Sequence, residues 1–150
     1  MGMKYMPVQI EGKWYSHPLS LNLYGLNFTK DNIRQTKIAY IFEAEKSVMQ
    51  LDGFDMLNCG VATCGSKLNK YALDILIREC HPQEVVLCFD KEEYKYGPYF
   101  NHLYEICKKY NQYCNFSFVY DKQNLLDLKD SPTDKGEQIF KKLLETRIKI

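Results

Sequence analysis

Two short apolar runs, each followed by acidic residues, constrain the fold of this 150-residue chain more than any other feature. The first covers residues 38–42 and leads into Glu43, and the second covers residues 85–89 and leads into Asp90 and Glu92. Continuous apolar runs of this length are typical of strands that are buried on both faces of a parallel sheet. Because ligands bind at the carboxyl ends of such strands, the sequence predicts a carboxylate-lined site at one edge of the sheet.

Strands and helices are expected to alternate along most of the chain. Strands are predicted over residues 38–42, 58–62, 84–89 and 114–120. The spacing of apolar residues predicts helices near residues 29–35, 45–52, 69–80, 98–110 and 132–147. This alternation predicts an α/β fold, a Rossmann-like parallel sheet of about four strands flanked by helices. With the strand order 2-1-3-4 the first and third strands are neighbours, which places Glu43 beside Asp90.

The N-terminal segment has a different pattern. Residues 8–10 and 13–15 flank Glu11 and Gly12, which predicts a short β-hairpin. We therefore divide the chain into an N-terminal β extension over residues 1–27 and an α/β domain over residues 28–150. Lys13 lies next to two aromatic residues, a combination that binds single-stranded nucleic acid, although packing of a hairpin face explains it equally well.

Composition excludes several classes of protein. Hydrophobic residues make up 45% of the chain and charged residues 26%, as in ordinary globular domains. No apolar run approaches the roughly 20 residues that span a bilayer, and no signal peptide is recognisable, so we expect a cytoplasmic protein without a membrane partner. The six cysteines lack Cys-x-x-Cys spacing, which favours buried thiols over a zinc site. A net charge of +1 indicates that any contact with nucleic acid is local or is assisted by other domains.

The acidic residues suit a divalent cation. Asp90 and Glu92 are two residues apart and face the same side of an extended strand, and their oxygens are the ligands that Mg²⁺ or Mn²⁺ prefers. Glu43 completes the shell, or acts as a general acid or base if burial raises its pKa. Asp127 and Asp130, on the loop after the fourth strand, are candidate ligands of a second metal. The alternative interpretation is a solvated acidic loop.

A second candidate contact lies in the turn over residues 63–67. Gly65, Ser66 and Lys67 are small or basic and suit a phosphate group. The turn lacks the pattern of a P-loop, so a nucleoside triphosphatase of that class is not supported. The three histidines are scattered, which argues against a histidine-based metal site.

Five short segments, in the same order along the chain, resemble motifs of the Toprim catalytic domain of DnaG-type bacterial primases. They are residues 23–28, 41–48, 62–66, 89–92 and 128–132. The resemblance runs from about residue 13 to residue 150 and is closest to primases of phages and mobile elements. It implies a Toprim fold and Mg²⁺-dependent nucleotidyl transfer, in which ribonucleoside triphosphates are joined into RNA primers on a single-stranded DNA template.

The resemblance also implies roles for single residues. Glu43 would be the catalytic glutamate, Asp90 and Glu92 the metal-binding pair, and Asp130, together with Asp127, the additional acidic ligand. Residues 13–27 would be the end of the basic subdomain that precedes Toprim in primases. A replicative helicase would be a further partner, through domains that this chain does not contain.

Three residues depart from the primase pattern. Glu92 replaces an aspartate, Ser47 replaces a further aspartate, and Ala44 replaces a glycine. Two other functions therefore stay open: a stand-alone Toprim nuclease, in which water is the nucleophile, and a non-catalytic Toprim interaction module. Residues 23–26 favour the primase over the nuclease, whereas Ser47 and the missing zinc-binding and helicase-binding domains favour the module or a chain that is inactive alone.

Overall fold

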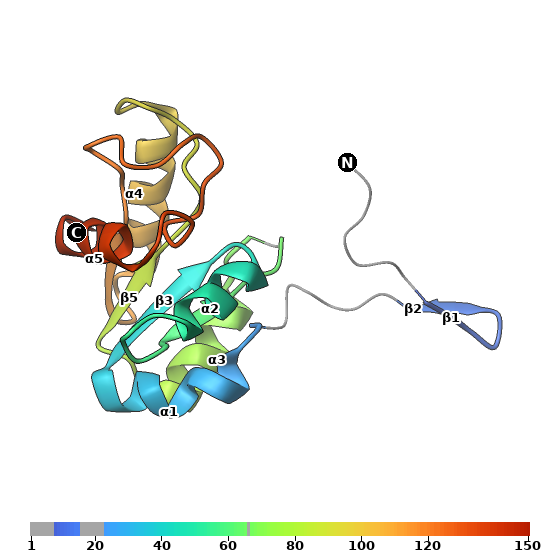
Figure 1. Ribbon diagram of the computed structural model, residues 1–150. Helices are drawn as coiled ribbons and strands as arrows, with labels where there is room; N and C mark the ends of the chain where they lie inside the picture. The colour runs from blue at the N-terminus through green and yellow to red at the C-terminus, as the bar shows by residue number, and fades with distance from the viewer. Residues whose placement is uncertain (1–7, 16–22, 66) are drawn as a thin grey trace.

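A five-stranded mixed sheet forms the centre of the computed structural model, which describes residues 8–15, 23–65 and 67–150 (Figure 1). The strand order is β4-β3-β5-β6-β7. The first four strands pair in parallel, and the last pairs antiparallel with β6. The strands are β3 (Ile38–Phe42), β4 (Gly60–Ala62), β5 (Glu84–Leu87), β6 (Asn115–Phe118) and β7 (Ile148–Lys149).

Helices cover both faces of this sheet. The described residues form the helices α1 (Leu26–Thr36), α2 (Glu45–Asp52), α3 (Lys70–Cys80), α4 (Pro98–Tyr110) and α5 (Glu137–Glu145). Side chains of α1, α3 and α4 pack in one buried cluster with Ile41 and Val85, and side chains of α2 and α5 pack in a second cluster with Phe42 and Val86. Neighbouring strand residues point to opposite faces, so both faces of β3 and β5 are apolar and buried. Across the described parts of the chain, no helix is long and apolar enough to cross a membrane.

The α/β class and the predicted order of the four parallel strands are confirmed. The prediction missed β7, and it extended the last helix too far at both ends. Residues 131–136 form turns instead of helix, because the Ser131 N–H donates to the Asp134 carboxylate at 2.8 Å and Gly136 has a φ of 93°. After α5, Arg147 forms a bidentate ion pair with Glu84, at 2.7 and 2.9 Å, beside the short strand β7.

The predicted N-terminal hairpin is confirmed as β1 (Val8–Ile10) paired antiparallel with β2 (Lys13–Tyr15). Its two turn residues, Glu11 and Gly12, have positive φ angles of 49° and 76°. Such angles suit a two-residue hairpin turn. Further along, Leu23 is buried in the core and Tyr24 forms an isolated bridge with Ala62. The boundary at residue 27 stays a prediction.

A buried lysine fastens the loop after β6 to the end of β5. The Lys91 ammonium donates to the Asp121 carboxylate at 2.8 Å, the Asn124 side chain at 3.1 Å and the Leu126 carbonyl at 2.9 Å. The side chains of Lys91 and Asp121 are 4% and 2% exposed. Main-chain bonds reinforce the contact, since the Lys91 N–H donates to the Asp130 carbonyl at 2.9 Å. All three donors of the ammonium are therefore satisfied away from water.

Removal of this lysine is expected to destabilise the protein strongly. Lys91→Ala leaves the Asp121 carboxylate buried without its cation, which lowers the free energy of unfolding by about 3–5 kcal/mol. Lys95→Ala, at an exposed lysine of the same segment, is the matched control and changes it by less than about 0.5 kcal/mol. Urea denaturation followed by circular dichroism measures both, and equal midpoints for the two variants would contradict the assignment.

Candidate active site

The acidic site lies where β3 and β5 end side by side. Ile41 of β3 is in register with Leu87 of β5, so the residues that follow the two strands meet at one edge of the sheet. There the Asp90 N–H donates to Glu43 Oε1 at 3.3 Å. The structure therefore brings together Glu43 and Asp90, the two residues that the strand order predicted to be neighbours.

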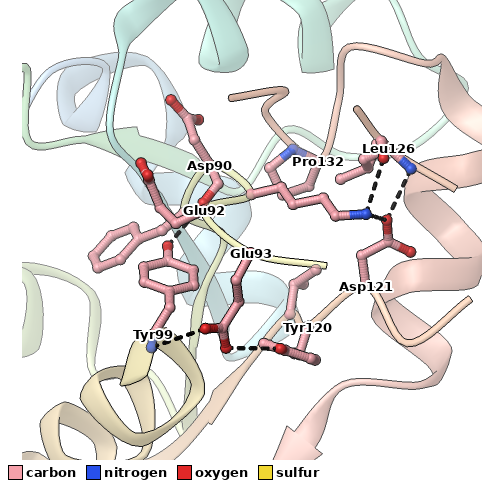
Figure 2. A pocket seen from close by; sticks show the side chains of 11 residues that line it. Asp90, Glu92, Glu93, Tyr99, Tyr120, Asp121, Leu126 and Pro132 are labelled. Carbon is pink, nitrogen blue, oxygen red and sulfur yellow. Dashed lines mark hydrogen bonds and ion pairs between the residues drawn. The ribbon is translucent and has the colours of Figure 1, made fainter. Parts of the chain in front are cut away.

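The side chains of residues 90–93 point alternately to two sides of the chain. Asp90 and Glu92 point toward one side, whereas Glu93 points away from them toward Tyr120 (Figure 2). Glu93 accepts hydrogen bonds from the Tyr120 hydroxyl at 2.8 Å and from the Gly97 N–H at 2.9 Å. The two acids that face the site are thus separated from the acid that has a structural role, as the alternation of an extended chain requires.

Glu93 also fixes the start of α4. Its carboxylate accepts from the N–H groups of Tyr99 at 3.2 Å and Phe100 at 2.9 Å, which are donors that a helix start otherwise leaves unpaired. The Tyr99 hydroxyl in turn donates to the Asp90 carbonyl at 2.8 Å (Figure 2). This pair of contacts ties the main chain of Asp90 to a rigid helix. The sequence did not reveal the role of Glu93, because Glu93 lies in a run of charged residues and caps α4 from outside the usual N-cap position.

Burial and mutual repulsion shape the charges of the inner carboxylates. Burial, followed by the neighbouring Asp90 carboxylate, raises the pKa of Glu43 to about 7. Burial, followed by the charge of Asp134, raises the pKa of Asp90 to about 6. Among the described residues, neither Glu43 nor Asp90 forms an ion pair with a basic side chain. A carboxylate pair of this kind is stabilised by a bound cation.

The outer carboxylates are neutralised by lysines. Lys129 forms an ion pair with Glu92, and Lys46 forms one with Asp134 at 2.8 Å. A third lysine, Lys135, lies 2.7 Å from the Asp127 carboxylate and 3.5 Å from the Asp130 carboxylate. Asp134 was not selected from the sequence, yet its charge acts on Asp90 more strongly than that of any other side chain.

The donor set fits Mg²⁺ only in part. Within residues 8–15, 23–65 and 67–150, no group of three or more His, Cys, Asp or Glu side chains is close enough to hold a metal ion. Mg²⁺, however, is held in many proteins by one or two carboxylates together with water and substrate phosphates. Glu43 and Asp90 would supply that minimal set, whereas Glu92 is paired with Lys129. The catalytic role of Glu43 and the ligand roles of Asp90, Glu92, Asp127 and Asp130 stay predictions.

One of the predicted phosphate contacts, Gly65, already has a main-chain partner. The Gly65 N–H donates to the Glu43 carbonyl at 3.2 Å, so this amide is already engaged, and Gly65 has a φ of 87°. Lys67 is exposed and lines a cavity together with Glu43 and Gly65. Ser66 lies outside the described residues. Lys13 is exposed on the hairpin, and its contact with nucleic acid stays a prediction.

Ser47, at the position where primases carry a further acid, takes part in a buried contact. Its hydroxyl lies 2.6 Å from the Ser131 hydroxyl, and the side chain is almost completely buried. The contact joins α2 to the loop that carries Asp130. A structural role therefore occupies the position that the resemblance assigns to a metal ligand.

Comparison with solved structures places this fold among the RNA polymerase domains of DnaG primases. The Aquifex aeolicus primase, in its zinc-binding and RNA polymerase domains, aligns with a TM-score of 0.67 and 16% identity over 92% of this chain and 32% of that chain. A Pseudomonas aeruginosa DNA primase domain aligns with a TM-score of 0.65 and 17% identity over 89% and 41%. The RNA polymerase domain of Mycobacterium tuberculosis DnaG, in complex with double-stranded DNA, aligns with a TM-score of 0.64 and 18% identity over 93% and 45%. This likeness defines the fold alone.

One curated protein is similar in sequence. The SPbeta prophage-derived uncharacterized protein YorJ of Bacillus subtilis (strain 168) is 34% identical over 162 aligned positions, which cover 99% of this chain and 43% of that protein. The chain thus spans less than half the length of this relative. No family model matches the chain.

The pKa of Glu43 is expected to depend on its neighbour. Asp90→Asn removes the charge that opposes ionisation of Glu43, so the pKa of Glu43 falls from about 7 toward its ordinary value of 4.5. Carboxyl carbon chemical shifts followed against pH measure this change. Asp74→Asn, at an exposed position of α3, is the matched control and leaves the titration of Glu43 where it is. An unchanged pKa in the Asp90→Asn protein would contradict the coupling.

Stability is expected to fall as the pH rises across the site's titration range. The folded-state pKa of Glu43, about 7, lies above its ordinary value of 4.5, so between these values the folded protein binds more protons than the unfolded chain. Mg²⁺ relieves the repulsion and raises the melting temperature more at pH 8 than at pH 5. Calorimetry at both pH values measures the difference. An equal gain in the Asp90→Asn protein would show that Mg²⁺ binds elsewhere.

Proposed function

We propose that this chain is the Toprim catalytic part of a DnaG-like primase, which joins ribonucleoside triphosphates into RNA primers on single-stranded DNA with the help of Mg²⁺. The observation that carries the proposal is the hydrogen bond from the Asp90 N–H to the Glu43 carboxylate, which brings together two acids that form no ion pair in the described chain. The fold of the DnaG polymerase domains and the five ordered motifs support it.

The protein's own groups suit a hydroxyl nucleophile at neutral pH. Mg²⁺, when bound, lowers the pKa of the attacking hydroxyl and neutralises phosphate charge. Glu43, with a pKa of about 7, is suited to accept the proton from that hydroxyl. Asp90 is suited to orient the reacting groups, since the Tyr99 hydroxyl holds its main chain and the next residue, Lys91, is anchored to Asp121. At the rim the exposed side chains of Lys46 and Lys129 attract phosphates.

DNA is the proposed template partner. The similar structures that contain DNA include the M. tuberculosis domain with double-stranded DNA and a DnaG catalytic domain bound to single-stranded DNA. The net charge of this chain is only +1, so its own grip on a template is local. Contact with a replicative helicase belongs to the same proposal and requires segments outside this chain.

A second candidate function is a non-catalytic Toprim module. The ion pair of Lys129 with Glu92 and the buried bond between Ser47 and Ser131 favour it, because both occupy groups that a two-metal site needs. A nuclease is chemically close, since the same carboxylates activate water as readily as a hydroxyl. Assays for product type therefore separate the three functions.

The decisive assay is extension of a short RNA primer annealed to single-stranded DNA, because extension does not require a template-reading domain. With Mg²⁺ and labelled ribonucleoside triphosphates, the chain is expected to lengthen the primer, and Asp90→Asn to lower the rate at least about 100-fold. Asp74→Asn is the matched control and keeps the wild-type rate. Shortened template strands would identify a nuclease. Absence of any product, despite Mg²⁺ binding, would exclude catalysis by this chain and favour the interaction module.

A further inference from the structure

A cavity of about 310 Å³ opens next to Glu43, between the turn after β4 and helix α4. It is separate from the small pocket around Asp121 and Glu93 that Figure 2 shows. Its lining includes Phe89, Ile106 and Lys109, and Glu43 is its one acidic member within the described chain. The cavity therefore adjoins the carboxylate site but differs from it in chemical character.

One side of α4 is dedicated to this cavity. Tyr99, His102, Ile106 and Lys109 are spaced by three or four residues, so they form one stripe along the helix, and all four line the cavity. The buried residues Leu103 and Cys107 occupy the neighbouring stripe, which faces the core. Tyr99 and Ile106 also touch the core at the base of the cavity, whereas His102 and Lys109 are exposed.

The cavity stripe combines aromatic rings with cations. The Tyr99 and His102 rings lie 6.5 Å apart, and the Lys109 ammonium lies 5.1 Å from the centre of the Tyr110 ring. Lys67 contributes a second exposed lysine on the opposite wall. Aromatic faces bind nucleobases by stacking, and lysines bind phosphate, so the lining has the composition of a site for single nucleotides.

The wall of the cavity is already rigid. The Tyr99 hydroxyl donates to the Asp90 carbonyl at 2.8 Å, and the main-chain N–H of Tyr99 donates to the Glu93 carboxylate at 3.2 Å. A ligand that stacks there loses little free energy to the ordering of side chains. The same contacts fix the distance between the cavity and the carboxylates.

We propose that this cavity binds one nucleoside phosphate unit, with its base among Phe89, Tyr99 and Ile106 and its phosphate beside Lys109 and Lys67. The volume is in the range of small-molecule sites, and the mixed lining matches a base that carries an anionic group. Two sources share this chemistry: a free ribonucleotide, and the terminal nucleotide of a single strand. The inference rests on the proposed function only for the purpose of binding, which is to present a nucleotide to Glu43.

Titration of the 150-residue chain with adenosine 5′-monophosphate tests the site without catalysis. In EDTA, amide chemical shifts are expected to change over α4 and at Phe89. Ile106→Trp fills the cavity and weakens binding at least about tenfold, and Lys109→Ala removes a phosphate contact and weakens it about threefold or more. Lys108→Ala, the exposed lysine one residue earlier on α4, lies outside the lining and is the matched control. If Ile106→Trp fails to fold, the nucleotide affinities of Lys109→Ala and Lys108→Ala still test the site.

A second arm uses a single-stranded DNA hexamer in place of the mononucleotide. If Ile106→Trp weakens binding of the mononucleotide alone, the occupant is a free nucleotide. If it weakens binding of the hexamer alone, the occupant is a strand terminus. Weakening of both supports the shared unit. If neither ligand shifts the α4 amides, or if Lys108→Ala weakens binding as much as Lys109→Ala, the site is overturned.

The same variants separate this inference from the proposed function. Asp90→Asn is expected to stop primer extension while binding of the mononucleotide in EDTA stays unchanged. Nucleotide binding in the cavity without any primer extension would leave the subsite standing and remove the primase proposal. If the Ile106→Trp protein extends primers with an unchanged KM for ribonucleotides and also binds the mononucleotide unchanged, the primase proposal stands and the subsite is overturned.

Discussion

The buried ion pair between Lys91 and Asp121 is the constraint on which the rest of the acidic edge depends. Lys91 lies between Asp90 and Glu92 in the sequence. The segment that presents these two acids to the site is therefore bound on its other side to the loop after β6. That loop carries the remaining acids, including Asp130, whose carbonyl accepts from the Lys91 N–H. A buried charge pair is costly to form and more costly to break, which makes the arrangement specific.

Charge is distributed unevenly over this edge. Lysines neutralise the outer acids, whereas Glu43 and Asp90 have elevated pKa values of about 7 and about 6 because they are partly buried and close to other carboxylates. Perturbed pKa values of this kind cluster at functional sites. The neighbouring cavity has the opposite character, with aromatic and basic side chains along α4. The proposed cation site and the proposed nucleotide site would therefore lie side by side.

The sequence predicted those parts of the structure that depend on local pattern. The apolar runs before Glu43 and Asp90 identified two strands, and the alternation with helices indicated a parallel sheet, for which the order 2-1-3-4 was one possibility. A feature that depends on a distant partner was missed, namely β7, which lies beside the ion pair of Arg147 with Glu84. For the same reason the sequence could not show that the predicted ligands of the outer group are paired with lysines. The spacing of these acids can be read from the sequence, whereas their ion pairs with lysines form only in the folded structure.

The pairing of Glu92 with Lys129 has a consequence for how this edge responds to ions. Any cation that coordinates Glu92 must first displace an ammonium group, so binding there is an exchange of one positive charge for another. Such an exchange lowers the apparent affinity for the incoming ion, and it depends on ionic strength because Lys129 is exposed. The displaced ammonium stays attached to a flexible stem at the mouth of the site. Lys129 would therefore compete with a metal ion for Glu92, and once displaced it would be a counter-ion for an anion bound to that metal.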